Sequence, residues 1–120
     1  LPMKEPATEL TLESPAGLIG IKADCVNGKV VNVTFENVPA FATHTDVEID
    51  VQGLGKVTVD VAWGGMFYVI ADAEQFNGLE LKVENGREIT SISSRLKAAA
   101  AEQLPVVHPE NPDLKMSRFP

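Results

Sequence analysis

Hydrophobic and polar residues alternate along most of the first two thirds of the chain. From Thr8 to about Val83 the apolar positions are mostly two residues apart, which is the period of a β-strand with one buried face. The stretch GLIGIKADC carries its apolar residues at alternate positions: Ile19, Ile21, Ala23 and Cys25. This pattern predicts antiparallel strands rather than helices in this part of the chain.

A turn signal follows the first of these runs. Asn27 and Gly28 form the Asn-Gly pair that favours a two-residue hairpin turn, because both turn positions need a positive φ. The next run, KVVNVTFENV, alternates again, with Val31, Val33 and Phe35 in phase. The two runs therefore predict a pair of antiparallel strands joined by a tight turn.

The alternation stops at residues 37–46 and then resumes. Pro39 cannot donate to a strand ladder, so we expect this stretch to be a crossing loop with Phe41 as its anchor. Three further strands are expected: DVEIDV at 46–51, KVTVDVAW at 56–63 after Gly53-Leu54-Gly55, and MFYVIADA at 66–73 after Gly64-Gly65. Together they predict a three-stranded meander.

A helical period replaces the alternation near the C-terminus. Ile89, Ile92, Leu96, Ala99 and Gln103 recur at helical spacing, and a run of four alanines favours helix. Asn85 followed three residues later by Glu88 is typical of a capped helix start, and Pro105 marks the stop. We expect one helix at about 86–103, an extended or loop tail, and an α+β fold of mostly antiparallel hairpins and meander.

Composition and charge exclude some classes of partner. The 120 residues carry a formal net charge of -7 and a pI near 4.7, which disfavours nucleic acid and anionic membrane surfaces as partners. No apolar run approaches the ~20 residues of a membrane span. A single cysteine cannot form an internal disulfide and is typical of a reducing compartment, so we expect a cytoplasmic location.

Few residues could carry chemistry. Cys25 is the only thiol, and its place on an apolar face predicts a structural role. His44 and His108 do not stand in a spacing that would place two metal ligands on one face, so no metal is expected. The sequence contains neither a Walker-type phosphate loop nor a GxGxxG turn, so no cofactor is expected either. Gly64-Gly65 indicates either a tight hairpin turn or a wall that lets a ligand or another backbone come close.

Three segments, taken in their order, resemble the middle of the proline racemase family. They are ESPAGLIGIKADCVNGKVVNVTFENVPAF, DVEIDVQGLGKVTVDVAWGGMFYVIADAEQ and AAAAEQLPVVHPENPD, with NVPAF, GLGKVTVD, GGMFY and HPENP as the most specific pieces. The resemblance covers about Glu13 to Asp113. The family includes proline racemases, 4-hydroxyproline 2-epimerases and trans-3-hydroxyproline dehydratases.

The resemblance implies part of a two-lobed, diaminopimelate-epimerase-like fold, with the active site between lobes that each wrap a sheet around a central helix. By this analogy residues 1–52 complete the first lobe and residues 53–120 begin the second. It also implies cofactor-independent chemistry at the α-carbon of proline or hydroxyproline, in which one side chain removes a proton and another delivers one. Gly64, Gly65, Phe67 and Tyr68 would then lie next to the substrate.

The sequence departs from the family at its catalytic motifs. The family's Cys-Gly-His stretch would lie upstream and its Pro-Cys-Gly-Thr-Gly stretch downstream, and Cys25 in KADCVNG matches neither. We therefore expect a longer parent protein, of which these residues would be the central segment, to be an enzyme. These 120 residues alone are expected to be inactive. Exposed strand edges would favour self-association or a dimer. The alternative is a stand-alone, non-catalytic β-rich binding or assembly module.

Overall fold

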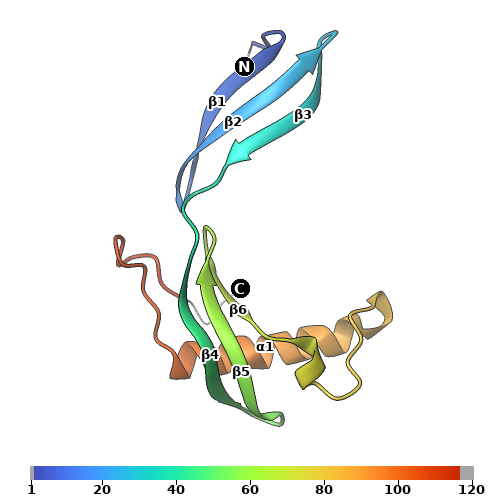
Figure 1. The fold of residues 1–120 in the computed structure, drawn as a ribbon, viewed down its shortest axis with the longest axis vertical. Helices are drawn as coiled ribbons and strands as arrows, with labels where there is room; N and C mark the ends of the chain where they lie inside the picture. Colours follow the sequence, from blue (N-terminus) through green and yellow to red (C-terminus); the bar gives the residue numbers. More distant parts are fainter. Residues whose placement is uncertain (1, 117–120) are drawn as a thin grey trace. The chain divides into compact units, whose positions relative to one another are not determined.

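The computed structural model describes residues 2–116, which form two compact units (Figure 1). The first unit extends to Ala40 and the second begins at Phe41. Each unit contains a three-stranded antiparallel sheet, and the second also carries a long helix near the C-terminus. The predicted fold class, antiparallel sheets with one C-terminal helix, is confirmed for the described residues.

The first unit is a meander of β1 (Ala7–Ser14), β2 (Gly17–Val26) and β3 (Lys29–Glu36), in that order across the sheet. The turn between β2 and β3 has positive φ at Asn27 (50°) and Gly28 (70°), as the Asn-Gly pair predicts. The Glu5 side chain accepts a hydrogen bond from the Gly28 N–H at 2.7 Å, which fixes the chain before β1 against this turn.

The second unit places β4 (Phe41–Val51), β5 (Gly55–Trp63) and β6 (Phe67–Ile70) in a meander, as expected. However, β4 begins at Phe41, so the expected crossing loop over 37–46 is wrong for its second half. The register shifts twice between Ala42 and Val47, and Asp46 has a φ of 53° with its N–H bonded to the Asp60 carboxylate at 2.8 Å. Such bulges interrupt the period of two, which hid this part of the strand in the sequence.

The compact units divide the chain between Ala40 and Phe41, whereas the expected division into residues 1–52 and 53–120 concerns the lobes of a longer protein and is not tested by these units. Strand β4 pairs with β5 from Phe41 to Val51, so it belongs to the second unit rather than to the first. The two strands are joined by a short hairpin turn at residues 52–54, and such local pairing is favoured over pairing with the preceding sheet. How the parent's lobes are divided stays a prediction.

Helix α1 (Gly86–Gln103) has the bounds that the periodicity predicts, after two short 3-10 turns at Ala73–Gln75 and Val83–Asn85. The expected side-chain cap at Asn85 is wrong. The Asn85 amide instead donates to the Glu80 carbonyl at 2.9 Å, because the 3-10 turn that precedes the helix directs this side chain back along the chain. Among the described residues, no helix is long and apolar enough to cross a membrane.

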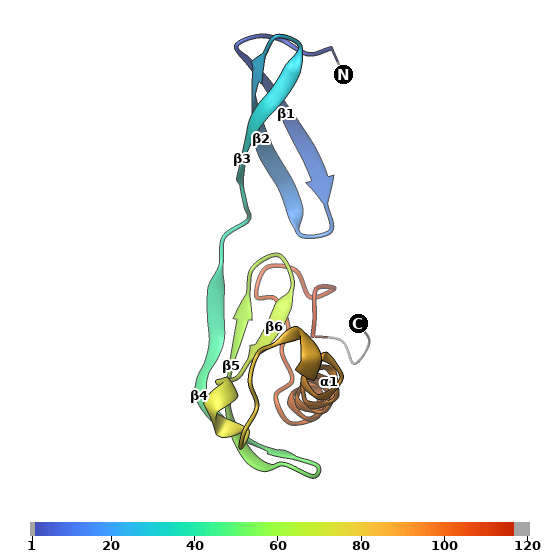
Figure 2. The same cartoon turned by 90° about the vertical axis from the view of Figure 1, so that its right-hand side faces the viewer.

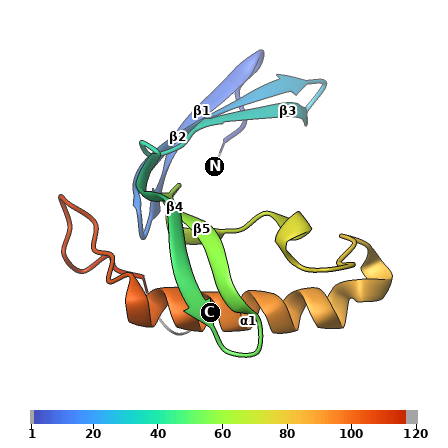
Figure 3. The same ribbon diagram turned by 60° about the horizontal axis from the view of Figure 1, so that its bottom comes forward.

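Helix α1 lies along one face of the second sheet (Figures 2 and 3). Its buried residues Ile92, Leu96 and Ala100 pack against the sheet. The core formed in this way contains eight buried residues: Ile49, Val51, Val57, Val59, Phe76, Ile92, Leu96 and Ala100. Val69 of β6 is partly buried against this core.

Two glutamines cover open strand edges of the second sheet. The Gln103 side chain bonds to the N–H and the C=O of Asp50 on β4, at 2.9 and 2.8 Å. The Gln75 side chain bonds in the same way to both backbone groups of Thr58 on β5, at 2.8 Å each. Each amide occupies the position that a further strand would otherwise take.

The segment after α1 folds back on itself. Val107 forms an antiparallel bridge with Lys115, and the Met116 N–H bonds to the Val106 carbonyl at 3.1 Å. The residues between them, including the HPENP piece, make the connecting loop, in agreement with the expected extended or loop tail. This folding brings His108 against the second sheet.

Candidate functional site

The turn between β5 and β6 contains the two adjacent glycines that the sequence singled out. Gly65 has a φ of 103°, a conformation that L side chains rarely adopt, so the turn itself requires glycine there. The Gly64 N–H bonds to the Met66 carbonyl at 3.1 Å and closes the turn. The hairpin interpretation of the sequence therefore explains Gly65.

Gly64 differs from its neighbour. Its φ lies outside the positive range, and a Cβ built on it would meet no heavy atom within 4 Å. Neither backbone conformation nor crowding by residues 2–116 requires glycine at this position. A glycine at such an open position is favoured where a group from outside these residues must come close to the backbone, because glycine has no side chain in the way.

An aromatic cluster supports this turn from the strand ends. Trp63 at the end of β5 is 4 % exposed, and its ring lies 4.9 Å from that of Phe67 and 4.7 Å from that of His108, centroid to centroid. Phe41 at the start of β4 completes the cluster, 5.3 Å from the His108 ring. These edge-to-face contacts join β4, β5, β6 and the segment after α1.

Backbone contacts fix the orientation of His108. Its ring Nδ1 accepts a hydrogen bond from the backbone N–H of Glu110 at 3.2 Å. The backbone N–H of His108 donates to the Leu114 carbonyl at 2.8 Å. In the neutral ring the proton is therefore on Nε2. Sequence reasoning weighed His108 only as a metal ligand and missed its place in this cluster, because His108 is far along the chain from Trp63.

Phe67 and Tyr68, the two apolar candidates, have different surroundings. Successive residues of a strand point to opposite faces, so they cannot both face one ligand on the same side of β6. Phe67 is half-buried against Trp63, while Tyr68 is 50 % exposed. Gly64, Gly65 and Phe67 thus lie together around the turn, and Tyr68 lies beside them on the other face.

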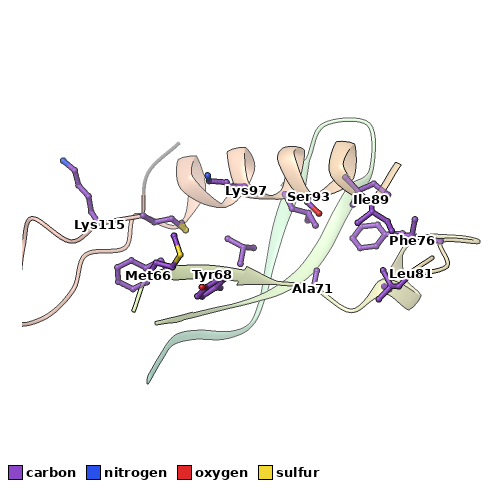
Figure 4. Close-up of a pocket in the computed structure, with 16 residues that line it drawn as sticks. Met66, Tyr68, Ala71, Phe76, Leu81, Ile89, Ser93, Lys97 and Lys115 are labelled. Carbon is purple, nitrogen blue, oxygen red and sulfur yellow. The ribbon is translucent and has the colours of Figure 1, made fainter. Parts of the chain in front are cut away.

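A groove of about 670 Å³ runs between β6 and α1 (Figure 4). Its walls include Phe67 and Val69 from the strand and Ile89 from the helix. Nearly all of its other lining residues are apolar, and its charged residues, Lys97 and Lys115, are both cationic. A zwitterion such as an amino acid needs groups for both charges, so this groove is poorly suited to one.

Cys25 lies in the first unit and is 2 % exposed. Its Sγ is 3.4 Å from the Ala23 carbonyl oxygen and 3.5 Å from Thr8 Oγ1. It contacts no group that would serve as a base or stabilise a thiolate, so the geometry agrees with the structural role expected from its place in the alternation. No three His, Cys, Asp or Glu residues within 2–116 are grouped in a way that could hold a metal ion.

Titratable groups are otherwise on the surface. His44 Nδ1 lies 3.1 Å from Thr43 Oγ1 and contacts no carboxylate in the structure. The pKa of Lys56 is raised by its hydrogen bond and attraction to Glu48, 2.6 Å away, but both side chains are exposed.

Comparison with known proteins gives this geometry its context. The family model described as proline racemase matches residues 1–119. The chain belongs to the proline racemase family. It is similar to the crystal structure of a probable proline racemase from Agrobacterium radiobacter with bound carbonate, at 36 % identity and a TM-score of 0.88. It is equally similar, at 34 % identity and a TM-score of 0.88, to a hydroxyproline epimerase from Agrobacterium vitis with bound trans-4-hydroxy-L-proline.

Both matches cover 97 % of this chain but only 34 % of the other chain. The 120 residues thus span about a third of the length of these family members. The expected membership of the proline racemase family is confirmed.

Proposed function

We propose that residues 1–120 are one part of a cofactor-independent enzyme that moves a proton at the α-carbon of proline or hydroxyproline. The observation that carries this proposal is the family match over residues 1–119. Two solved relatives at 34 % identity or more support it. One of these relatives was solved with trans-4-hydroxy-L-proline bound. Racemase, 2-epimerase and dehydratase all remain within this proposal.

The catalytic pair of this enzyme would come from residues beyond the 120 considered. Support comes from the surroundings of Cys25, which is buried and matches neither catalytic motif of the family. The 120 residues alone should therefore be inactive. A cytoplasmic location is part of the same proposal, because the single cysteine needs no oxidising compartment.

The test is exchange of the α-proton in deuterated water, followed by proton NMR with L-proline and with trans-4-hydroxy-L-proline as separate substrates. A longer protein that contains these residues should exchange at least one of them, and residues 1–120 purified alone should exchange neither. Exchange by residues 1–120 alone would contradict the placement of the catalytic pair. No exchange by the longer protein would contradict the enzymatic proposal itself.

We infer further that the Gly64-Gly65 turn lies next to the substrate in the longer protein, with Phe67 or Tyr68 as its apolar contact. The support is that Gly64 is open and unstrained, so the described residues do not explain its lack of a side chain. Gly65 needs no such explanation, because its φ of 103° does so.

This inference predicts that Gly64→Ala leaves folding almost unchanged but lowers kcat/KM by about tenfold or more, since a misplacement of one ångström can cost that much or more. Gly65→Ala is the matched variant. It should destabilise the fold by about 1 kcal/mol or more, because alanine at a φ of 103° is strained. Thermal unfolding and steady-state kinetics on both variants separate the two effects, and full activity in Gly64→Ala would contradict the inference.

A second candidate, a non-catalytic binding or assembly module, is favoured by one observation. Several large apolar side chains of β3 are more than half exposed, among them Val31, Val33 and Phe35. Such a face favours association with another protein surface or a second copy. A protein of this length that lacks α-proton exchange and forms a stable dimer would support this candidate.

A further inference from the structure

The chain contains three Asn-Gly pairs, and each lies in a turn or at the start of the helix. They are Asn27-Gly28, Asn77-Gly78 and Asn85-Gly86. An asparagine followed by glycine is especially prone to spontaneous loss of its side-chain amide, because glycine has no side chain that would hinder attack by its own backbone nitrogen. The contacts of each pair decide whether that attack is possible in the folded protein.

The reaction starts at the backbone nitrogen of the glycine. This nitrogen attacks the side-chain carbonyl carbon (Cγ) of the asparagine, a new C–N bond closes a five-membered imide, and the amide nitrogen leaves as ammonia with the proton of the glycine N–H. Water then opens the imide and gives aspartate or isoaspartate, in which the backbone continues through the side chain. A glycine N–H that is held in a hydrogen bond is therefore protected, because that bond must open before the nitrogen can turn toward Cγ.

The Asn27-Gly28 pair is protected by a carboxylate. The Gly28 N–H donates to Glu5 Oε1 at 2.7 Å, and both residues of the pair hold the positive φ of the turn between β2 and β3. The flanking residues Val26 and Lys29 are paired across the two strands. Rotation of Asn27 toward ring closure would therefore break the hairpin turn as well as this hydrogen bond.

The Asn85-Gly86 pair is protected by the start of α1. The Gly86 N–H donates to the Val83 carbonyl, and Gly86 has helical φ and ψ angles of -54° and -35°. The Asn85 side-chain amide donates to the Glu80 carbonyl at 2.9 Å, so both reacting groups are held by other contacts. Ring closure here requires fraying of the first helical turn.

The Asn77-Gly78 pair has no protection of this kind. It forms the centre of a turn that the Leu79 N–H closes on the Phe76 carbonyl at 2.9 Å, in the connection between β6 and α1 (Figure 1). Gly78 has a φ of 76°, and both residues of the pair are exposed. Within residues 2–116, the Gly78 N–H and the Asn77 side chain make no hydrogen bond. The attacking nitrogen and the group that it attacks are both open to solvent.

We propose that Asn77 is a site of spontaneous deamidation in this protein, and that Asn27 and Asn85 are preserved by the contacts of their glycines. The product has a structural consequence, because Phe76 is 9 % exposed and belongs to the core of the second unit. Isoaspartate adds one carbon to the backbone and a negative charge within the turn, so it disturbs the hydrogen bond between Phe76 and Leu79. The inference does not rest on the proposed function.

Trypsin separates the three pairs, which allows a direct test. Cleavage after lysine and arginine gives peptides 23–29, 57–82 and 83–87, each with one Asn-Gly pair. The purified native protein is incubated at mildly alkaline pH, and mass spectrometry follows the conversion of each amide to an acid, beside a sample that was not incubated. Peptide 57–82 should be converted at least about tenfold faster than either of the others. Equal rates in the three peptides, or no conversion of 57–82, would overturn the proposal.

Removal of the acceptor of one hydrogen bond tests the protection itself. Glu5→Ala frees the Gly28 N–H and should speed conversion of peptide 23–29 by about threefold or more, while peptide 83–87 should be converted at its former rate. Unchanged conversion of 23–29 in this variant would contradict protection by the hydrogen bond.

Asn77→Gln is the matched variant for the structural consequence, because glutamine would have to close a larger ring and therefore deamidates much more slowly. Incubation should lower the Tm of the unchanged protein by about 2 °C or more and should leave the Tm of Asn77→Gln nearly unchanged. Equal losses of Tm would overturn the assignment of this effect to Asn77. None of these readouts involves catalysis, so their outcome is separate from that of the α-proton exchange experiment.

Discussion

The two sheets share the same hydrophobic alternation but differ in what covers it. In the second sheet, alternate residues of β4 and β5 such as Ile49 and Val59 are 2 % and 1 % exposed, because α1 packs on that face. In the first sheet, Val33 and Phe35 alternate in the same way and are 55 % and 60 % exposed. Alternation thus shows that a face should be buried without showing what buries it.

The two units therefore differ in how much of their apolar surface is buried. The second sheet carries a core with a helix of its own, and two glutamines cover open edges at Asp50 and Thr58. In the first unit only Ala23 and Cys25 are buried hydrophobic residues within the described part. Within that unit the apolar face of β3 is therefore exposed.

The largest effect that separates the sheets should come from truncating one buried and one exposed side chain. Ile49→Ala should cost about 2–5 kcal/mol of the stability of the second unit, because it leaves a cavity. Val33→Ala should cost less than about 1 kcal/mol, because its side chain is already in contact with solvent. Urea unfolding followed by the fluorescence of Trp63, the single tryptophan, reports on the second unit.

Equal losses for Ile49→Ala and Val33→Ala, the latter followed by circular dichroism, would remove the distinction between the two sheets. A change in the Trp63 transition caused by Val33→Ala would also contradict the expectation that this substitution affects only the first unit.

The next effect concerns association through the first sheet. Phe35→Lys should weaken self-association of residues 1–120 by about tenfold or more, since burial of one phenylalanine contributes about 1.5–3 kcal/mol. Thr34→Lys is the matched control, because the adjacent residue of β3 faces the other side of the sheet. Analytical ultracentrifugation over a range of concentrations gives both dissociation constants, and a monomer at every concentration would refute the association.

A smaller effect is expected at the covered edge of the second sheet. Gln103→Ala removes both hydrogen bonds to the Asp50 backbone and should lower stability by about 0.5–1.5 kcal/mol. Glu102→Ala, at the next exposed helix position, has no such bonds in the structure and should change stability by less than about 0.5 kcal/mol. If chemical unfolding finds the two variants alike, the glutamine does not act as a strand substitute.

The smallest effect belongs to the ion pair of Lys56 and Glu48 across β4 and β5. Glu48 raises the pKa of Lys56 above its ordinary value of 10.5, so the charged lysine favours the folded state. This contribution is complete below pH 10.5 and is lost as the pH rises through the folded-state pKa. Because the pair is exposed, the effect should be slight and should decrease with salt.

Thermal unfolding of Lys56→Gln between pH 9 and 12, beside the unchanged chain, measures this loss. As the pH rises, Tm should fall slightly less in the variant than in the unchanged chain, because the variant has no ion pair to lose. Identical pH profiles would show that the pair contributes nothing to stability.

Much of the second unit follows from local signals in the sequence. The period of α1 and the stop at Pro105 gave its bounds, and the glycine pairs gave the turns of the meander. The start of β4 did not follow, because bulges at His44 and Asp46 break the period of two. The aromatic cluster did not follow either, since His108 meets Trp63 only after the chain folds back beyond α1.

The candidate site was also predictable only in part, because some of its features depend on contacts between residues that are far apart in the sequence. The Gly64-Gly65 turn is a local feature, and its special backbone at Gly65 was visible in the sequence. The distinction between a strained Gly65 and an open Gly64 needs coordinates, because it depends on φ and on surrounding atoms. The groove beside β6 depends on how α1 and the segment after it pack against that strand, which no local pattern specifies.

The central claim is that these residues are one part of a larger proline racemase-family protein that covers the faces and edges left open here. The most direct measurement is the intact mass of the protein isolated from its native source. The account predicts a mass about three times the 12.9 kDa of these residues, since they span 34 % of each solved relative. A native protein of about 12.9 kDa would contradict it, because no further residues would then supply the catalytic pair.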